Sequence, residues 1–149
     1  MMVVATVEHA RALRDALASR GYDLFDLGAT GLYREMDVWS TLARVLDAHG
    51  APDVEAFHAL VGAPVLSAAA RFGGVAVFGE MTSVLCSMCR SEAALRLEHL
   101  WGDLRSRGRI DLLCAFRLGD FLHDECNLLF EQLCSAHIDG CVHAQRATR

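Results

Sequence analysis

The sequence predicts a three-layer α/β protein in which a mostly parallel sheet is flanked by helices. Short apolar runs alternate with longer segments whose apolar residues recur at helical spacing, as expected when each strand is followed by a crossover helix. The run 75–78 is apolar at every position, which is typical of a parallel strand covered on both faces. The chain has 149 residues and 53% of them are hydrophobic, which is sufficient for one globular domain with a buried core.

The first predicted unit is a strand followed by a helix. Residues 2–6 form the strand end, and the hydroxyl of Thr6 is suited to cap a helix that continues to Gly21. Residues 32–38 are a weaker strand candidate, because charged side chains interrupt them. A short helix is expected over about 40–48, where apolar residues again share one side.

The middle of the chain is expected to be helical up to a central strand. An apolar stripe begins at Val54, and Pro64 must kink or split this helix because proline lacks an amide donor. Gly73 and Gly74 then stop the helix before the strand at 75–78.

Helices and one more strand are predicted in the remaining chain. Residues 81–88 repeat at helical spacing, and a second helix is expected from a cap at Ser91 to Gly108. Residues 110–116 are the last clear strand, and 121 to about 137 form a final amphipathic helix. The apolar positions in line on this last helix are Leu122, Cys126, Leu129 and Leu133.

The composition argues against nucleic-acid and membrane partners. The formal net charge is −5 and the arginines are scattered, so the basic face that nucleic acid requires is missing. No apolar run approaches the roughly 20 residues needed to span a bilayer, and the first four residues are too short and uncharged for a secretory signal. We therefore expect a cytoplasmic protein whose six cysteines are reduced thiols.

Three segments in this order resemble the MEDS family, the methanogen/methylotroph sensory domain. They are 77–81 (Val-Phe-Gly-Glu-Met), 92–101 and 112–116, and the similarity extends more loosely to 4–6 and 52–61. The resemblance implies a RecA-like or KaiC-like fold used for sensing in bacterial or archaeal signal transduction or transcription control. Some members are associated with responses to one-carbon or halogenated compounds.

The resemblance also sets the expected domain limits. Residues 1–143 are expected to form a single MEDS-like sensory domain, followed by a polar tail at 144–149. Family members usually start with an earlier strand and helix, so the chain is expected to be truncated at the N-terminus. This predicts a homo-oligomer formed through an exposed sheet edge. No Gly-x-x-x-x-Gly-Lys loop is present, so ATP hydrolysis is not expected and the protein is not predicted to be an enzyme.

Glu80 is the main candidate site residue. It follows the central apolar strand, and ligands of open α/β sheets bind at the carboxyl ends of strands. A helix cap or an ion pair is the alternative role, because helix N-termini favour negative charge. Four further residues could line an apolar ligand pocket or could equally be core residues: Met81, Trp101, Cys114 and Phe116.

The cysteines offer a second, metal-based interpretation. Cys86 and Cys89 form a Cys-x-x-Cys that we expect inside a helix, without the second pair of a zinc signature. Better candidates for zinc are four residues within ten positions: Cys134, His137, Cys141 and His143. Histidines at a helix end also interact with the helix dipole, which is the simpler explanation.

Three functions follow from these observations. The leading hypothesis is a non-enzymatic sensory domain that binds a small molecule or a regulatory protein in a strand-end crevice near Glu80 and Phe116. The alternative is a thiol- or metal-responsive protein that uses the C-terminal Cys/His cluster. Residual nucleotide binding without hydrolysis is the third.

Overall fold

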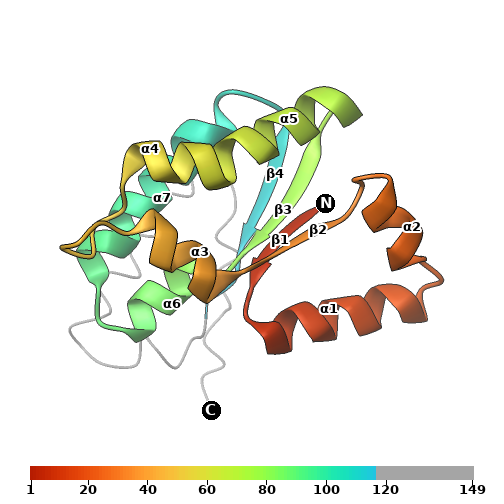
Figure 1. The fold of residues 1–149 in the computed structure, drawn as a ribbon, viewed down its shortest axis with the longest axis horizontal. Helices are drawn as coiled ribbons and strands as arrows, with labels where there is room; N and C mark the ends of the chain where they lie inside the picture. The colour runs from red at the N-terminus through yellow and green to blue at the C-terminus, as the bar shows by residue number, and fades with distance from the viewer. Residues whose placement is uncertain (117–149) are drawn as a thin grey trace, which may run out of the picture.

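Residues 1–116 are described in the computed structural model, and their four parallel strands form one sheet with helices on both faces (Figure 1). The strands lie in the order β2-β1-β3-β4, so β1 is an inner strand. Their bounds are Met2–Ala5 for β1, Arg34–Asp37 for β2, Val75–Gly79 for β3 and Ile110–Cys114 for β4. The predicted three-layer α/β class with a mostly parallel sheet is confirmed, and the arrangement is consistent with a RecA-like one.

The helices fall into two groups, one on each face of the sheet. The chain moves from β1 to β2 in one direction and from β2 past β1 to β3 in the other, so right-handed crossovers place the two sets of helices on opposite faces. One face carries α1 (Val7–Ser19) and α2 (Leu24–Ala29). The other face carries α3 (Val38–Val45), α4 (Val54–Phe57), the π-helix η1 (His58–Gly62), α5 (Ala63–Phe72), α6 (Met81–Ser87) and α7 (Ser91–Arg105).

Side chains of β1 alternate between two hydrophobic cores. Met2 and Val4 pack into the larger core, which the helices from α3 to α7 cover. Val3 and Ala5 pack into a smaller core with residues of α1 and α2. All four side chains are buried, as expected for a parallel strand with helices on both sides.

Local sequence signals set several helix boundaries as predicted. Thr6 caps α1, and its hydroxyl oxygen accepts the N–H of His9 at 3.4 Å. Pro64 lies in the first turn of α5, and the π-helix η1 separates this helix from α4, so the predicted split occurs. Gly73 ends α5 with φ at 73°, a left-handed conformation that glycine adopts without steric cost.

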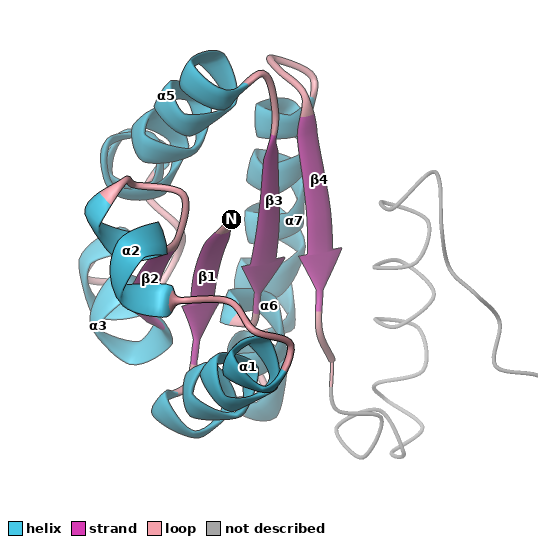
Figure 2. Cartoon of the chain, turned by 90° about the vertical axis from the view of Figure 1, so that its right-hand side faces the viewer, coloured by secondary structure: helices cyan, strands magenta, loops and turns pink. Residues whose placement is uncertain are grey.

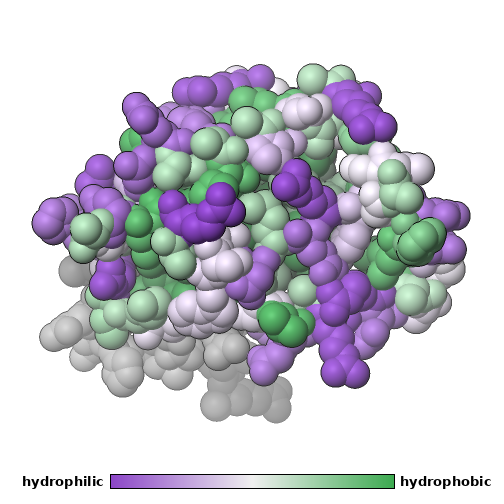
Figure 3. Space-filling model, in the orientation of Figure 1, coloured by the Kyte–Doolittle hydropathy of each residue, from purple (hydrophilic) through white to green (hydrophobic). Residues whose placement is uncertain are grey.

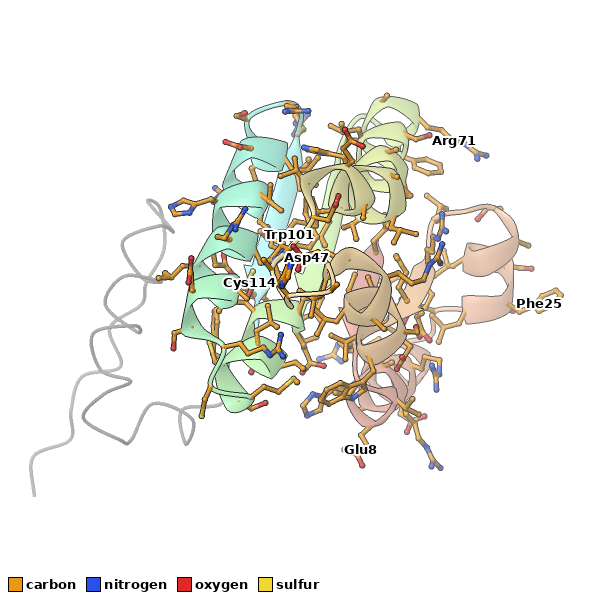
Figure 4. All side chains as sticks on the ribbon, turned by 60° about the vertical axis from the view of Figure 1, so that its left-hand side comes forward. Glu8, Phe25, Asp47, Arg71, Trp101 and Cys114 are labelled. Atoms are coloured by element: carbon orange, nitrogen blue, oxygen red, sulfur yellow. The ribbon has the colours of Figure 1, made fainter. Side chains whose placement is uncertain are left out.

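Two features of the first half differ from the prediction. The helix expected from about residue 40 begins at Val38, because the side chain of Asp37 accepts the N–H of Ser40 at 2.8 Å. The helix α2 was not predicted, since its six residues are too few to show an apolar period. Its Phe25 is 83% exposed and points away from the molecule (Figure 4), and hydrophobic atoms lie over α2 at the right of Figure 3.

Two predictions for the region after β3 are wrong. Ser91 does not cap α7, because Arg90 occupies the cap position and makes no side-chain cap hydrogen bond. Cys86 and Cys89 do not share a helix, since α6 ends at Ser87 and Cys89 has φ at 57°. Cys86 is buried, whereas Cys89 is exposed.

The strand order makes β2 and β4 the edges of the described sheet, and β1 has a paired neighbour on each side. The sequence of β2 is Arg-Glu-Met-Asp, and charged residues on an edge strand discourage pairing with another chain. Among the helices of residues 1–116, none combines the length and apolarity needed to cross a bilayer.

Candidate functional site

The candidate site lies where the carboxyl ends of β1 and β3 meet. The chain leaves β1 toward one side of the sheet, to β2, and β3 lies on the other side, so the two strands flank a topological switch point. Ligands of open α/β sheets bind outside such a point. Thr6 directly follows β1 and Glu80 directly follows β3, and the backbone N–H of Glu80 donates to the carbonyl of Val4 at 2.9 Å.

Glu80 therefore emerges at the carboxyl edge of the parallel sheet, as predicted, and its carboxylate turns toward β1. Oε2 accepts the backbone N–H of Thr6 at 2.8 Å and the Thr6 hydroxyl at 3.3 Å. Oε1 pairs with Nδ1 of His9. These donors satisfy a carboxylate whose side chain is only 8% exposed, and a buried carboxylate without such partners would be costly.

The first turn of α1 positions His9 for this pair. Because the Thr6 side chain caps the helix through the N–H of His9, the imidazole lies beside the carboxylate that also binds Thr6. A carboxylate only accepts hydrogen bonds, so Nδ1 of His9 carries the proton. Nε2 makes no hydrogen bond to another residue of the described chain, and the His9 side chain is 44% exposed.

The structure distinguishes among the structural roles considered for Glu80. It occupies the cap position of α6 but makes no side-chain cap hydrogen bond there. The side chain that pairs with its Oε1 in the described chain is a histidine rather than an arginine. Contact between Glu80 and a ligand remains a prediction.

A second acid lies near the same end of the sheet. Glu98 of α7 is buried, accepts a hydrogen bond from the hydroxyl of Thr82, and lies 4.0 Å from Sγ of Cys114 through Oε2. Burial, followed by the negative charge of Glu98, raises the pKa of the Cys114 thiol well above its ordinary value. Glu80 occupies the cap position of α6, and Thr82 in the first turn of the same helix donates to Glu98. Both acids therefore meet the start of α6.

Sequence reasoning missed both His9 and Glu98. The signal for Glu98 was present, because it follows Leu97 and precedes Trp101 by three residues on the apolar side of α7. The signal for His9 was weaker, since a histidine in the first turn of a helix has many ordinary roles. Only the pairing of β1 with β3 brings it to Glu80, 71 residues further along the chain.

The structure places two of the four residues expected beside Glu80 in the larger hydrophobic core. Met81 and Trp101 are each 1% exposed and belong to the larger core, where the Trp101 ring meets that of Phe57 edge to face at 5.2 Å. Figure 4 shows Trp101 and Cys114 in the interior of the molecule. Phe116 is half-buried and packs against the same core.

The proposed zinc ligands Cys134, His137, Cys141 and His143 lie outside the described residues. Within 1–116, no group of three or more histidine, cysteine or acidic side chains is arranged to hold a metal ion. A groove of about 400 Å³ is present in this part of the chain, but none of the predicted site residues lines it.

Comparison of the chain with family models, with curated proteins and with solved structures finds no match in any of the three. The geometry of the site is that of a histidine held by a buried carboxylate at the switch point of a parallel sheet.

Proposed function

We propose that this protein is a non-enzymatic sensory domain that binds a small molecule at the carboxyl edge of its sheet, between β1 and β3. The observation that supports this is the pair formed by buried Glu80 and half-exposed His9. The carboxylate fixes the orientation of the imidazole, and the exposed side of the ring is at the place where ligands of such sheets bind.

The geometry suggests the chemistry of the ligand. In the form of His9 that carries a single ring proton, on Nδ1 toward Glu80, Nε2 is a hydrogen-bond acceptor. A ligand that donates through a hydroxyl or an amine complements this acceptor. Small alcohols and amines also agree with the one-carbon compounds that the resemblance to sensory domains implies.

Signalling by such a domain requires two conformations with different ligand affinity, because a ligand that binds both equally shifts neither. The helix α1 begins at Thr6, and both Thr6 and His9 are bonded to Glu80. A ligand at His9 would therefore act on the contact that joins the start of α1 to the end of β3.

A panel of one-carbon alcohols and amines, including methanol and methylamine, tests this function by thermal shift on the full chain. A ligand at 100 times its Kd adds about 2.7 kcal/mol to stability, which is readily detected. We expect a compound that raises the melting temperature of the wild type and of His49→Ala but not of His9→Ala. His49 is a matched control, because it is an exposed histidine in the turn after α3.

Two outcomes would contradict the proposal. One is that every stabilising compound acts equally on His9→Ala and the wild type. The other is that a bound compound is chemically converted on incubation with the wild type but not with His9→Ala, because a histidine paired with a carboxylate can also act as a general base. The second result would make the protein an enzyme.

A further inference from the structure

One face of β3 and β4 is uncovered in the part of the chain that the structure describes. Figure 2 looks onto this face, with α7 behind the two strands and no described helix in front of β4. Alternate residues point to it: Ala76 and Phe78 from β3, and Asp111 and Leu113 from β4. Leu113 is 64% exposed, and Ala76 and Asp111 are exposed as well.

The uncovered face forms one side of a groove of about 400 Å³. Leu13 of α1 stands at one side of the groove, and Phe78 contacts the small core to which Leu13 belongs. Leu113 lies on the outer strand at the other side. Arg105 and Asp111 supply one charge of each sign, and the remaining lining is mainly apolar. Parallel sheets are ordinarily covered on both faces, so an apolar groove here indicates a missing layer.

We propose that residues 121–137 of this chain dock in this groove as an amphipathic helix beside α1. The apolar positions of that segment recur at helical spacing: Leu122, Cys126, Leu129 and Leu133. On a helix these four positions would lie along a single stripe, which would match the one apolar side that β3 and β4 give the groove. The structure shows the apolar face of β3 and β4, and the sequence contains a segment whose apolar pattern fits that face.

The path of the chain agrees with this occupant. The described chain leaves β4 after Cys114 at the carboxyl end of the strand, and residues 117–120 remain as a connection to the segment. A helix over 121–137 is about 25 Å long at 1.5 Å per residue. The five residues of β4 span about 16 Å, so an antiparallel helix covers the strand from end to end.

The covalent connection also favours this segment over a second copy of the protein. A segment joined by a short linker has an effective concentration in the millimolar range. A second copy at micromolar concentration would have to bind the same groove far more tightly to displace it. The segment is therefore the favoured occupant unless a partner offers a better apolar stripe.

Hydrogen exchange of the full chain, followed by mass spectrometry, tests the proposal. We expect the amides of 121–137 to be protected by at least about tenfold relative to an unstructured peptide, because docking stabilises their helical hydrogen bonds. Leu113→Glu places a charge in the groove and should remove most of this protection. Val54→Glu is the control, since Val54 is also exposed but lies on α4, across the sheet.

Two further variants, one in the groove and one in the segment, test the same contact if Leu113→Glu folds poorly. Leu113→Ala should lower the protection of 121–137 partially, and Leu129→Glu should lower it as Leu113→Glu does while leaving the amides of β3 protected. The proposal is wrong if 121–137 exchanges freely in the wild type, or if Leu113→Glu leaves its protection unchanged. Protection that rises with protein concentration would also overturn it and would indicate a second copy in the groove. None of these outcomes depends on ligand binding at His9.

Discussion

At the scale of single residues, the contact between Glu80 and the start of α1 is the central feature. It joins two segments that are distant in sequence, and it places a buried acid directly after β3. The sequence allowed the position of Glu80 at the sheet edge to be predicted, because an apolar run ends just before it. It did not reveal the partner, because no local pattern encodes a contact across 71 residues.

Substitution of Glu80 should separate its structural role from its role at His9. Glu80→Leu leaves the partly buried N–H of Thr6 without its acceptor, so we expect a loss of about 1–3 kcal/mol in the free energy of unfolding, measured with urea. Glu80→Gln retains an amide oxygen for Thr6 and should cost less. Glu55→Gln is the control, since Glu55 is exposed in α4. Equal stability of Glu80→Leu and the wild type would show that these contacts contribute nothing.

The described cysteines should differ in reactivity. Because burial and the charge of Glu98 raise the pKa of the Cys114 thiol, Cys114 stays protonated at pH 8, whereas Cys89 is exposed. Each unit of pKa changes the thiolate fraction about tenfold. With iodoacetamide on the native protein, peptide mapping should show Cys89 modified long before Cys114. In urea the two rates should converge, and equal rates in the native state would refute the assignment.

At the scale of elements, the strands were more predictable than the helix ends. The strands β1, β3 and β4 follow clear apolar runs, and even the charged β2 lies within its predicted range. Helix starts depend on one side-chain hydrogen bond, and the sequence offers several candidates for it. At α3 the acceptor is Asp37, and at α7 no side chain caps the helix.

The turn after α3 should make the free energy of unfolding depend on pH in the acidic range. The side chain of Asp47 accepts the N–H of Ala51 at 2.9 Å and that of His49 at 2.8 Å, and these bonds lower the pKa of the Asp47 carboxyl. A carboxyl with a lowered pKa contributes stability that is present above its ordinary pKa and is lost as the pH falls through the folded value.

The test is the urea midpoint measured between about pH 6 and pH 2, where carboxyl groups titrate. Asp47→Asn keeps an acceptor but cannot titrate, so its midpoint should fall less than that of the wild type. Asp15→Asn, at an exposed position on α1, should behave like the wild type. A parallel decline for Asp47→Asn and the wild type would contradict the prediction.

At the scale of the whole molecule, the strand order and the two cores determine which face of the sheet is left uncovered. Among the described residues, the larger core is complete under the helices from α3 to α7, whereas the smaller core under α1 and α2 leaves β4 uncovered. The fold class could be predicted because strand and helix signals alternate. The order of the strands and the groove could not, because both depend on which strands pair.

Self-association is expected at β4 rather than at β2. The outer edge of β4 has no paired strand among the described residues, whereas β2 exposes charged residues that oppose pairing. Light scattering after size exclusion should show a molar mass that rises from micromolar to millimolar protein. Asp111→Lys, which changes the charge of the β4 strand, should alter this rise, and Arg34→Glu on β2 should not. A constant monomer mass would exclude an oligomer through the sheet edge.

The position of β1 also affects how the protein is made. The strand Met2–Ala5 is synthesised before both strands with which it pairs, because Val4 pairs with Met36 and with Gly79. The sheet cannot close around this strand until the chain has been made beyond residue 79, and long-range pairing of this kind folds slowly. Until β3 has been made, the apolar strand β1 lacks one of its two neighbours, and a chaperone that binds extended apolar segments could hold it during that interval.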